Sequence, residues 1–221
     1  MISYDYILFD LDGTLTDPVI GVTNAVMYAL RHFGFSVTDR RELYPFIGPP
    51  LADSFQKYYH LSPSQAAEAI AKYREYYAPT GIFEAEVYPG IPEMLQRLRD
   101  AGLPLLLTTN KPEPYALQVL EHFDLARWFD YISGASMDES TQKWQVIRSA
   151  LTRCGVTDPA RAVMVGDRKH DAEGAKRCGV RDCIGVLYGY GSREELTAAG
   201  VSALAESPAQ IADIILNSFT E

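Results

Sequence analysis

The residues of this chain that could do chemistry gather directly after short apolar runs of the sequence. Carboxyl, hydroxyl, amide and ammonium groups follow three of these runs: Asp10, Asp12, Gly13 and Thr14; Thr108, Thr109, Asn110 and Lys111; and Gly166, Asp167 and Asp171. A further ammonium group, Lys143, begins a later helical segment. If the runs are strands of one parallel sheet, these groups meet at its carboxyl edge, where such sheets bind ligands.

The carboxylates among these residues predict a metal site. Asp10 and Asp12 are two residues apart, so in extended backbone their side chains lie on the same side, and Asp167 would join them. Three carboxylates at one edge repel one another unless a cation neutralises them. Ligand sets made only of oxygen favour a hard ion, Mg²⁺ above Zn²⁺. We therefore expect Mg²⁺ here.

The groups around the expected metal predict the reaction type. Mg²⁺ in proteins usually keeps several waters and takes phosphate oxygens of the substrate as ligands. Thr109, Asn110, Lys143 and the N–H groups near Gly13 could hold the remaining phosphate oxygens. The arrangement predicts phosphoryl transfer.

Competing motifs are excluded by spacing. An EF-hand loop beginning at Asp10 needs Gly at its sixth position and Glu at its twelfth, where this chain has Leu15 and Gly21. A Walker A loop needs a Gly-Lys dipeptide, and the sequence contains none. The patterns GxSxG and HExxH are also absent from the sequence.

Strand-length apolar runs alternate with segments of helical period along most of the chain. The expected strands are 6–9, 103–107, 131–133, 162–165 and 183–188, and the expected helices are 91–100, 113–123, 141–153, 171–178, 193–199 and 208–219. This alternation predicts an α/β protein in which a parallel sheet carries helices on both faces.

The stretch 16–86 departs from this alternation. It has no convincing strand and three amphipathic segments, 19–33, 51–59 and 63–77. We expect an all-helical insert over 16–86, whose tyrosines mostly pack its interior, and a core domain built from 1–15 and 87–221.

The charge and composition of the chain exclude some classes of binding partner. The formal net charge is −9 and the basic residues are scattered, so we expect no nucleic-acid polymer and no membrane as partner. No apolar run reaches the roughly 18 residues of a membrane span. Three cysteines without a CxxC pair, and a start without a basic segment, favour a reducing, cytoplasmic setting.

Four sequence segments resemble the motifs of the haloacid dehalogenase (HAD) superfamily of phosphohydrolases. They are FDLDGTLTD at 9–17, TTNK at 108–111, Lys143, and GDRKHD at 166–171. The resemblance covers essentially the whole chain, because the helical insert falls where this family places its cap. It implies a Rossmann-like core with a helical cap domain.

The resemblance also implies a role for each residue. Asp10 would be the nucleophile that forms an aspartyl-phosphate, and Asp12 the general acid and then the base. The implied Mg²⁺ ligands are Asp10, Asp12 through its backbone carbonyl, Asp167, and Asp171 as ligand or neighbour. Thr109 and Asn110 would bind phosphate, and Lys143 would offset charge on Asp10 and the phosphoryl group. By contrast, Lys111 and Lys169 are interpreted as solvated loop charges, and His170 as a turn residue or a neighbour of the ligands rather than a ligand.

The motifs look most like the branch of phosphoglycolate phosphatases and 5′-nucleotidase-like enzymes, with a small phosphorylated metabolite as substrate. Gly48, in the loop GPPL, could contact that substrate or simply form a turn between helices. We expect a phosphoglycolate phosphatase-like activity, with a 5′-nucleotidase as the alternative. A sugar phosphomutase and a non-catalytic regulatory protein of the same fold stay open, and the sequence leaves the oligomeric state open too.

Overall fold

The computed structural model describes residues 4–138 and 140–217 of the chain. The chain divides into two compact units, one formed by Met1–Thr16 with Val87–Glu221 and the other by Asp17–Glu86.

The first unit is built on a parallel sheet, which confirms the predicted α/β class. Within the described ranges the sheet has six strands in the order β5-β4-β1-β6-β7-β8, and every neighbouring pair is parallel. The strands are β1 (Tyr6–Phe9), β4 (Leu105–Pro112), β5 (Tyr131–Ala135), β6 (Ala162–Gly166), β7 (Asp182–Val186) and β8 (Ala203–Ala205).

The sheet differs from expectation in one additional strand and in several strand bounds. Strand β5 continues to Ala135 rather than ending at position 133, and β7 spans Asp182–Val186 rather than 183–188. Strand β8 was not predicted, because its sequence Ala-Leu-Ala is short and lacks the β-branched and aromatic residues typical of strands. Strand β4 begins at Leu105 rather than at position 103 and continues to Pro112, with an irregularity in its pairing to β5 after Thr108. Part of the predicted polar cluster therefore belongs to the strand itself.

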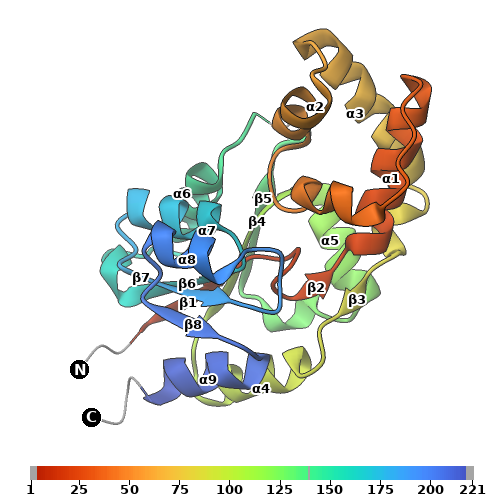
Figure 1. Cartoon of the computed structure of the whole chain (residues 1–221). Helices are drawn as coiled ribbons and strands as arrows, with labels where there is room; N and C mark the ends of the chain where they lie inside the picture. The colour runs from red at the N-terminus through yellow and green to blue at the C-terminus, as the bar shows by residue number, and fades with distance from the viewer. Residues whose placement is uncertain (1–3, 139, 218–221) are drawn as a thin grey trace. The chain divides into compact units, whose positions relative to one another are not determined.

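Helices cover the sheet on both faces, as predicted. They are α4 (Ile91–Asp100), α5 (Glu113–His122), α6 (Lys143–Arg153), α7 (Lys169–Arg177), α8 (Arg193–Ala199) and α9 (Pro208–Asn217), with 3₁₀ turns at Ala126–Trp128 and Pro159–Arg161. Figure 1 shows α6, α7 and α8 on one side of the sheet, and α4 beside α9 on the other. Because both faces are covered, the central strands are apolar on both sides.

Strand β1 is one of the two central strands of the sheet, and three of its four residues are fully buried in the core. Ile7, Leu8 and Phe9 are each 0% exposed. Leu8 pairs with Leu106 on one side and Met164 on the other, and these three side chains pack in one cluster with α6 and α7. Since β4 and β6 flank β1, the residues that follow these three strands lie at the same edge of the sheet, the position where open parallel sheets bind ligands.

The second unit is helical. Its elements are α1 (Val19–His32), a 3₁₀ segment at Arg40–Phe46, α2 (Leu51–Tyr59), α3 (Pro63–Tyr77) and a 3₁₀ turn at Gly81–Phe83, and α1 packs against α3. The predicted packing of aromatic residues holds for Tyr73 and Tyr77, which are buried and stacked with centroids 4.9 Å apart, but not for Tyr58, which is exposed.

Two short strands mark the passage between the units. Strand β2 (Thr16–Asp17) pairs with β3 (Glu86–Val87) in a two-stranded sheet that the sequence did not predict. At the start of α1, the Asp17 carboxylate accepts a hydrogen bond from the Val19 N–H at 3.0 Å and so stabilises the first turn.

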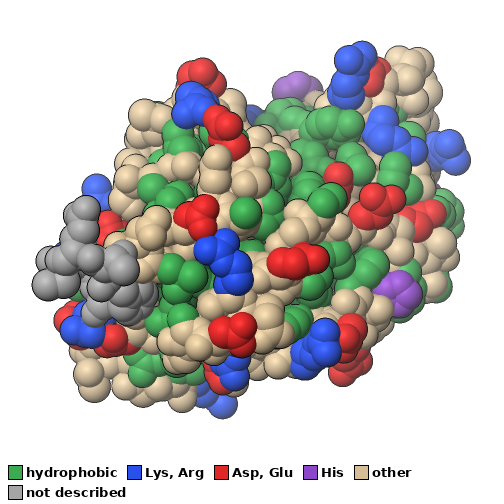
Figure 2. All heavy atoms as spheres, turned by 90° about the horizontal axis from the view of Figure 1, so that it is seen from below, with side chains coloured by type: hydrophobic (Ala, Val, Ile, Leu, Met, Phe, Trp, Pro, Cys, Tyr) green, Lys and Arg blue, Asp and Glu red, His purple; other side chains and the backbone are tan. Residues whose placement is uncertain are grey.

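No helix among the described residues is long and apolar enough to cross a membrane. On the face drawn in Figure 2, lysine and arginine side chains are interspersed with aspartate and glutamate, and that face shows no extended patch of one sign. This agrees with the scattered basic residues of the sequence.

A close contact inside the second unit gives a stability prediction. A Cβ atom at Gly21 on α1 would lie 1.8 Å from the backbone oxygen of Gly81, so Gly21→Ala must push two backbone segments apart. Alanine favours a helix by roughly 1 kcal/mol over glycine. We nevertheless expect a net loss of about 1–3 kcal/mol in the free energy of unfolding, measured by urea denaturation.

Gly34→Asn is the matched control. Nothing lies within 4 Å of a Cβ at Gly34, and asparagine tolerates its positive φ of 80°. A Gly21→Ala variant as stable as the wild type would contradict this packing.

Candidate active site

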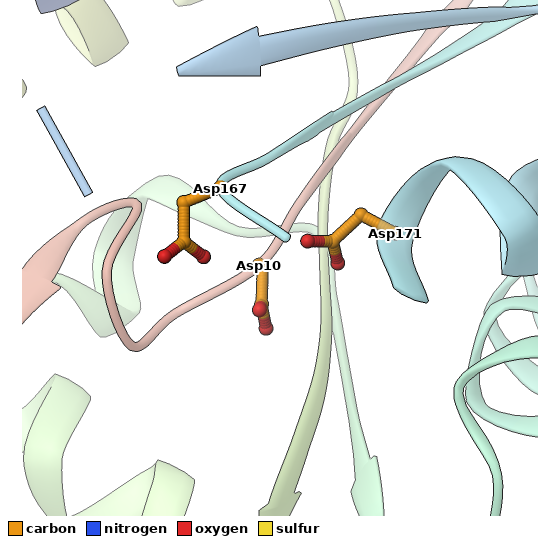
Figure 3. A group of neighbouring side chains, drawn as sticks. All are labelled: Asp10, Asp167 and Asp171. Carbon is orange, nitrogen blue, oxygen red and sulfur yellow. The ribbon is translucent and has the colours of Figure 1, made fainter. Parts of the chain in front are cut away.

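Three buried carboxylates meet at the carboxyl edge of the sheet. Each of Asp10, Asp167 and Asp171 offers one oxygen, and these oxygens all lie within 4.8 Å of one another. The three residues are 5%, 0% and 1% exposed. Figure 3 shows Asp10 at the end of β1, drawn between Asp167 from the end of β6 and Asp171 from α7.

Local structure positions Asp171 in this group. It is the third residue of α7, and its Oδ2 accepts the Arg168 N–H at 3.0 Å, which caps the helix. Gly166 gives the space for this, because a Cβ there would lie 2.2 Å from the Asp171 carboxyl carbon. The first turn of α7 thus fixes the direction of the carboxylate.

A single buried ammonium pairs with two of the carboxylates. Lys143 Nζ lies 2.8 Å from Asp10 Oδ1 and 2.7 Å from Asp171 Oδ1. Burial lowers the pKa of Lys143, but the two carboxylates outweigh it and the net shift is upward, so the lysine is charged. One positive charge leaves the group of three carboxylates with excess negative charge.

Burial and the excess negative charge together raise the pKa values of two of these carboxyl groups. Burial, followed by the neighbouring carboxylate Asp10, raises the pKa of Asp171 to about 6, with Lys143 opposing. Burial and the charges of Asp171 and Asp10 hold the pKa of Asp167 well above its usual range. A buried group of three carboxylates that offers only oxygen ligands and has excess negative charge fits a hard divalent cation.

The fourth predicted carboxylate, Asp12, has a different partner. Its Oδ1 and Oδ2 each lie 2.7 Å from Lys111 Nζ. Burial raises the pKa of Asp12, and Lys111 opposes this only in part. Asp12 therefore holds a proton more readily than an exposed aspartate, in a position separate from the other three carboxylates.

Lys111 corrects the sequence interpretation. It was expected to be a solvated loop charge, yet it is only 8% exposed and is paired with Asp12. Pro112 keeps the preceding residue extended, so Lys111 lies on the same side of the chain as Thr109 and pairs with Asp12, which is 99 positions away in the sequence. Lys169, in contrast, is exposed as expected, although it begins α7 and does not lie in a loop. His170, expected in a turn, is the second residue of α7, where it is partly exposed and its Nδ1 lies 3.8 Å from Glu173 Oε2.

The predicted phosphate-binding residues differ in their surroundings. Thr109 is buried and its Oγ1 accepts the Lys111 N–H at 3.2 Å, while Asn110 beside it is partly exposed. The Gly13 N–H already donates to the Thr16 carbonyl at 2.7 Å. Gly48 lies in the second unit, so its contact with substrate stays a prediction.

The loop after β7 also reaches the carboxylates, a contact that was not predicted from the sequence. The Tyr190 N–H donates to Asp167 Oδ2 at 2.8 Å. A signal was present, because Gly189 and Gly191 follow a buried strand at the ligand-binding edge, and glycine there often marks close backbone approach.

Known proteins resemble this chain over most of its length. The family description "Haloacid dehalogenase-like hydrolase" matches residues 7–186. A protein of Pseudomonas aeruginosa named 5′-nucleotidase is 43% identical over 198 residues, 89% of each chain. A phosphoglycolate phosphatase of Vibrio vulnificus is 32% identical over 96% of each chain. Tyrosine-protein kinase PtkA of Mycobacterium tuberculosis is 39% identical over 86% of this chain and 64% of its own length.

The comparison with solved structures agrees with these sequence matches. The crystal structure of a predicted phosphatase from Clostridium acetobutylicum superposes with a TM-score of 0.94 at 42% identity, covering 97% of this chain and 99% of that one. Together with the match over residues 7–186 and the buried carboxylates at the sheet edge, this shows that the chain belongs to the haloacid dehalogenase-like hydrolase family.

Proposed function

We propose that this phosphatase is a Mg²⁺-dependent hydrolase of small phosphate monoesters that acts through an aspartyl-phosphate on Asp10. The observation that carries the proposal is the division of the carboxyls into two environments. Asp10 lies with Asp167 and Asp171 beside Lys143, whereas Asp12 pairs separately with Lys111. With the proposed Mg²⁺ bound, the first environment would favour an ionised nucleophile, and the second would favour a proton donor.

In the first step, an oxygen of Asp10 bonds to phosphorus while the ester oxygen departs and takes a proton from Asp12. The raised pKa of Asp12 supports the proton-donor role, because a buried carboxyl holds its proton at higher pH than an exposed one. In the second step, Asp12 takes a proton from water, which displaces the phosphoryl group from Asp10.

The remaining residues stabilise charge. Lys143 contacts Asp10 directly and would lie beside the transferring phosphoryl group. Thr109 and Asn110 are proposed to hold phosphate oxygens, and Gly13 to shape the turn beside them. Mg²⁺, held by Asp10, Asp167, the Asp12 carbonyl and Asp171 as ligand or neighbour, would supply positive charge opposite the phosphate.

The proposed substrate is a nucleoside 5′-monophosphate, because the 43% identical relative is named 5′-nucleotidase. Phosphoglycolate is the second candidate, supported by the relative of that name at 32% identity. The helical unit Asp17–Glu86 is proposed as the cap domain that recognises the leaving group, with Gly48 among its contacts.

We also propose a cytoplasmic location. The free thiols Cys154, Cys178 and Cys183 suit a reducing compartment.

A substrate panel tests the reaction and its class. Phosphate release is measured from nucleoside 5′-monophosphates, phosphoglycolate, sugar phosphates, phosphotyrosine and a chromogenic ester, with and without EDTA. We expect one class to dominate, and both EDTA and Asp10→Asn to abolish release, because an amide cannot form the aspartyl-phosphate. Release that persists in Asp10→Asn would refute the covalent route.

The proton-donor role of Asp12 gives a second prediction. Asp12→Asn should lower kcat by about 10²–10⁴ for an alkyl phosphate, and by less for a chromogenic aryl ester, whose leaving oxygen needs little protonation. Steady-state kinetics on both esters measures the difference. Asp138→Asn, which changes an exposed carboxyl, serves as the control. Equal losses on the two esters would argue against the role.

The carboxyl pKa values predict how metal stabilisation depends on pH. The folded pKa of Asp171, about 6, exceeds its usual 3.8, and that of Asp167 is also raised. The metal-free folded state therefore binds extra protons, and their stabilising contribution is lost as pH rises from about 4 through 6. Mg²⁺ requires the deprotonated carboxylates, so its stabilising effect should grow over the same range.

The measurement is the change in Tm on adding MgCl₂ between pH 5 and pH 8. The increment should be larger at pH 8, and Asp167→Asn should remove most of it. The same increment at both pH values would show that these carboxyls do not compete between proton and metal.

A further inference from the structure

Asp167 lies between two backbone segments that come from distant parts of the chain. On one side, its Oδ2 accepts the Tyr190 N–H at 2.8 Å. On the other, the Thr14 hydroxyl approaches its Oδ1 at 3.5 Å, the outer limit of hydrogen bonding. Both carboxylate oxygens are thus in contact with polar groups of the flanking segments.

The two segments approach so closely that only glycine fits. A Cβ at Gly13 would lie 2.2 Å from Asp167 Oδ2, and one at Gly189 would lie 2.4 Å from Asp167 Cβ. The segments also meet directly, because a Cβ at Gly189 would lie 2.3 Å from the Gly13 carbonyl oxygen. A small shift of either segment would therefore displace the carboxylate.

One side chain joins the two segments. The Tyr188 hydroxyl donates to the Thr14 carbonyl at 2.9 Å, across 174 positions of sequence. Its ring meets Tyr88 edge to face, with centroids 4.8 Å apart, and the Tyr88 N–H donates to the Leu15 carbonyl at 3.1 Å. Burial raises the pKa of the Tyr188 hydroxyl, so it is a donor throughout the neutral pH range.

We propose that Tyr188 is a positioning residue for the metal-binding carboxylate Asp167. Its hydroxyl ties the turn at Gly13 and Thr14 to the loop of Gly189 and Tyr190, and the tied segments hold Asp167 in one orientation. The inference rests on the proposed metal-dependent function, in which Asp167 is a ligand. Tyr188 itself touches neither metal nor substrate in this proposal.

The test is Tyr188→Phe, which removes the hydroxyl and keeps the ring against Tyr88. Loss of one hydrogen bond, about 0.5–1.5 kcal/mol, corresponds to a roughly two- to tenfold increase in the Mg²⁺ concentration for half-maximal effect. This concentration is measured twice, from phosphate release and, without substrate, from the rise in Tm with MgCl₂. The KM for substrate at saturating Mg²⁺ should stay within about twofold, because Tyr188 acts on the metal ligand.

Tyr4→Phe is the matched control. Tyr4 is also buried, and its hydroxyl interacts with Asp182, the first residue of β7, at the opposite end of the strands. This variant loses a comparable tyrosine interaction away from the carboxylates. It should lower stability without changing the Mg²⁺ concentration for half-maximal effect.

The outcomes separate the two proposals. If Tyr188→Phe and Tyr4→Phe lose similar stability and neither changes Mg²⁺ affinity, Tyr188 is only structural and the inference is wrong. If the wild type hydrolyses no ester of the panel, the proposed function fails, while the Mg²⁺ titration of Tm still decides the role of Tyr188.

Discussion

Repulsion among carboxylates buried at one edge of a sheet is the constraint on which the rest of this molecule depends. Asp10, Asp167 and Asp171 are almost fully excluded from water, and a single ammonium, Lys143, contacts two of them. Burial of like charges is unfavourable unless opposite charge or hydrogen bonds compensate it. The fold must therefore hold these groups against their own repulsion. A bound cation would relieve the same repulsion.

The apolar sheet provides that rigidity. Asp10 and Asp167 directly follow the buried strands β1 and β6, and Asp171 lies in the first turn of the helix after β6. Strand β1 pairs with Leu105–Leu107 of β4 on one side and with Ala162–Val165 of β6 on the other, with side chains packed on both faces. Because interiors are close-packed, such strands move little relative to one another. The polar residues at the ends of these strands are therefore held at fixed distances from one another, which a flexible loop could not achieve.

The parts of the structure that could be predicted from sequence are those governed by neighbouring residues. Strands buried on both faces are visible in the sequence as continuous apolar runs such as Tyr6–Phe9. Asp10 and Asp167 follow two of these runs, which is why they could be predicted to lie close together. Strand β8 was not predicted, because three residues are too few to show the hydrophobic pattern of a strand. Lys111 was misinterpreted because its partner Asp12 is 99 positions away. The approach of Gly189 to Gly13 likewise depends on distances that only the folded chain defines.

The pairing of β2 with β3 has a consequence for how such a chain can change over evolution. The chain leaves the first unit at β2 and returns at β3, and these strands are hydrogen-bonded neighbours. The two ends of the helical unit are therefore adjacent, the arrangement in which insertion of one domain into another is best tolerated. A unit of different length or composition could replace the helical unit, because its two ends would still join the chain at the adjacent strands β2 and β3. Under the proposed role of this unit in recognising the leaving group, substrate range could diversify by exchange of the unit while the sheet and its carboxylates stay unchanged.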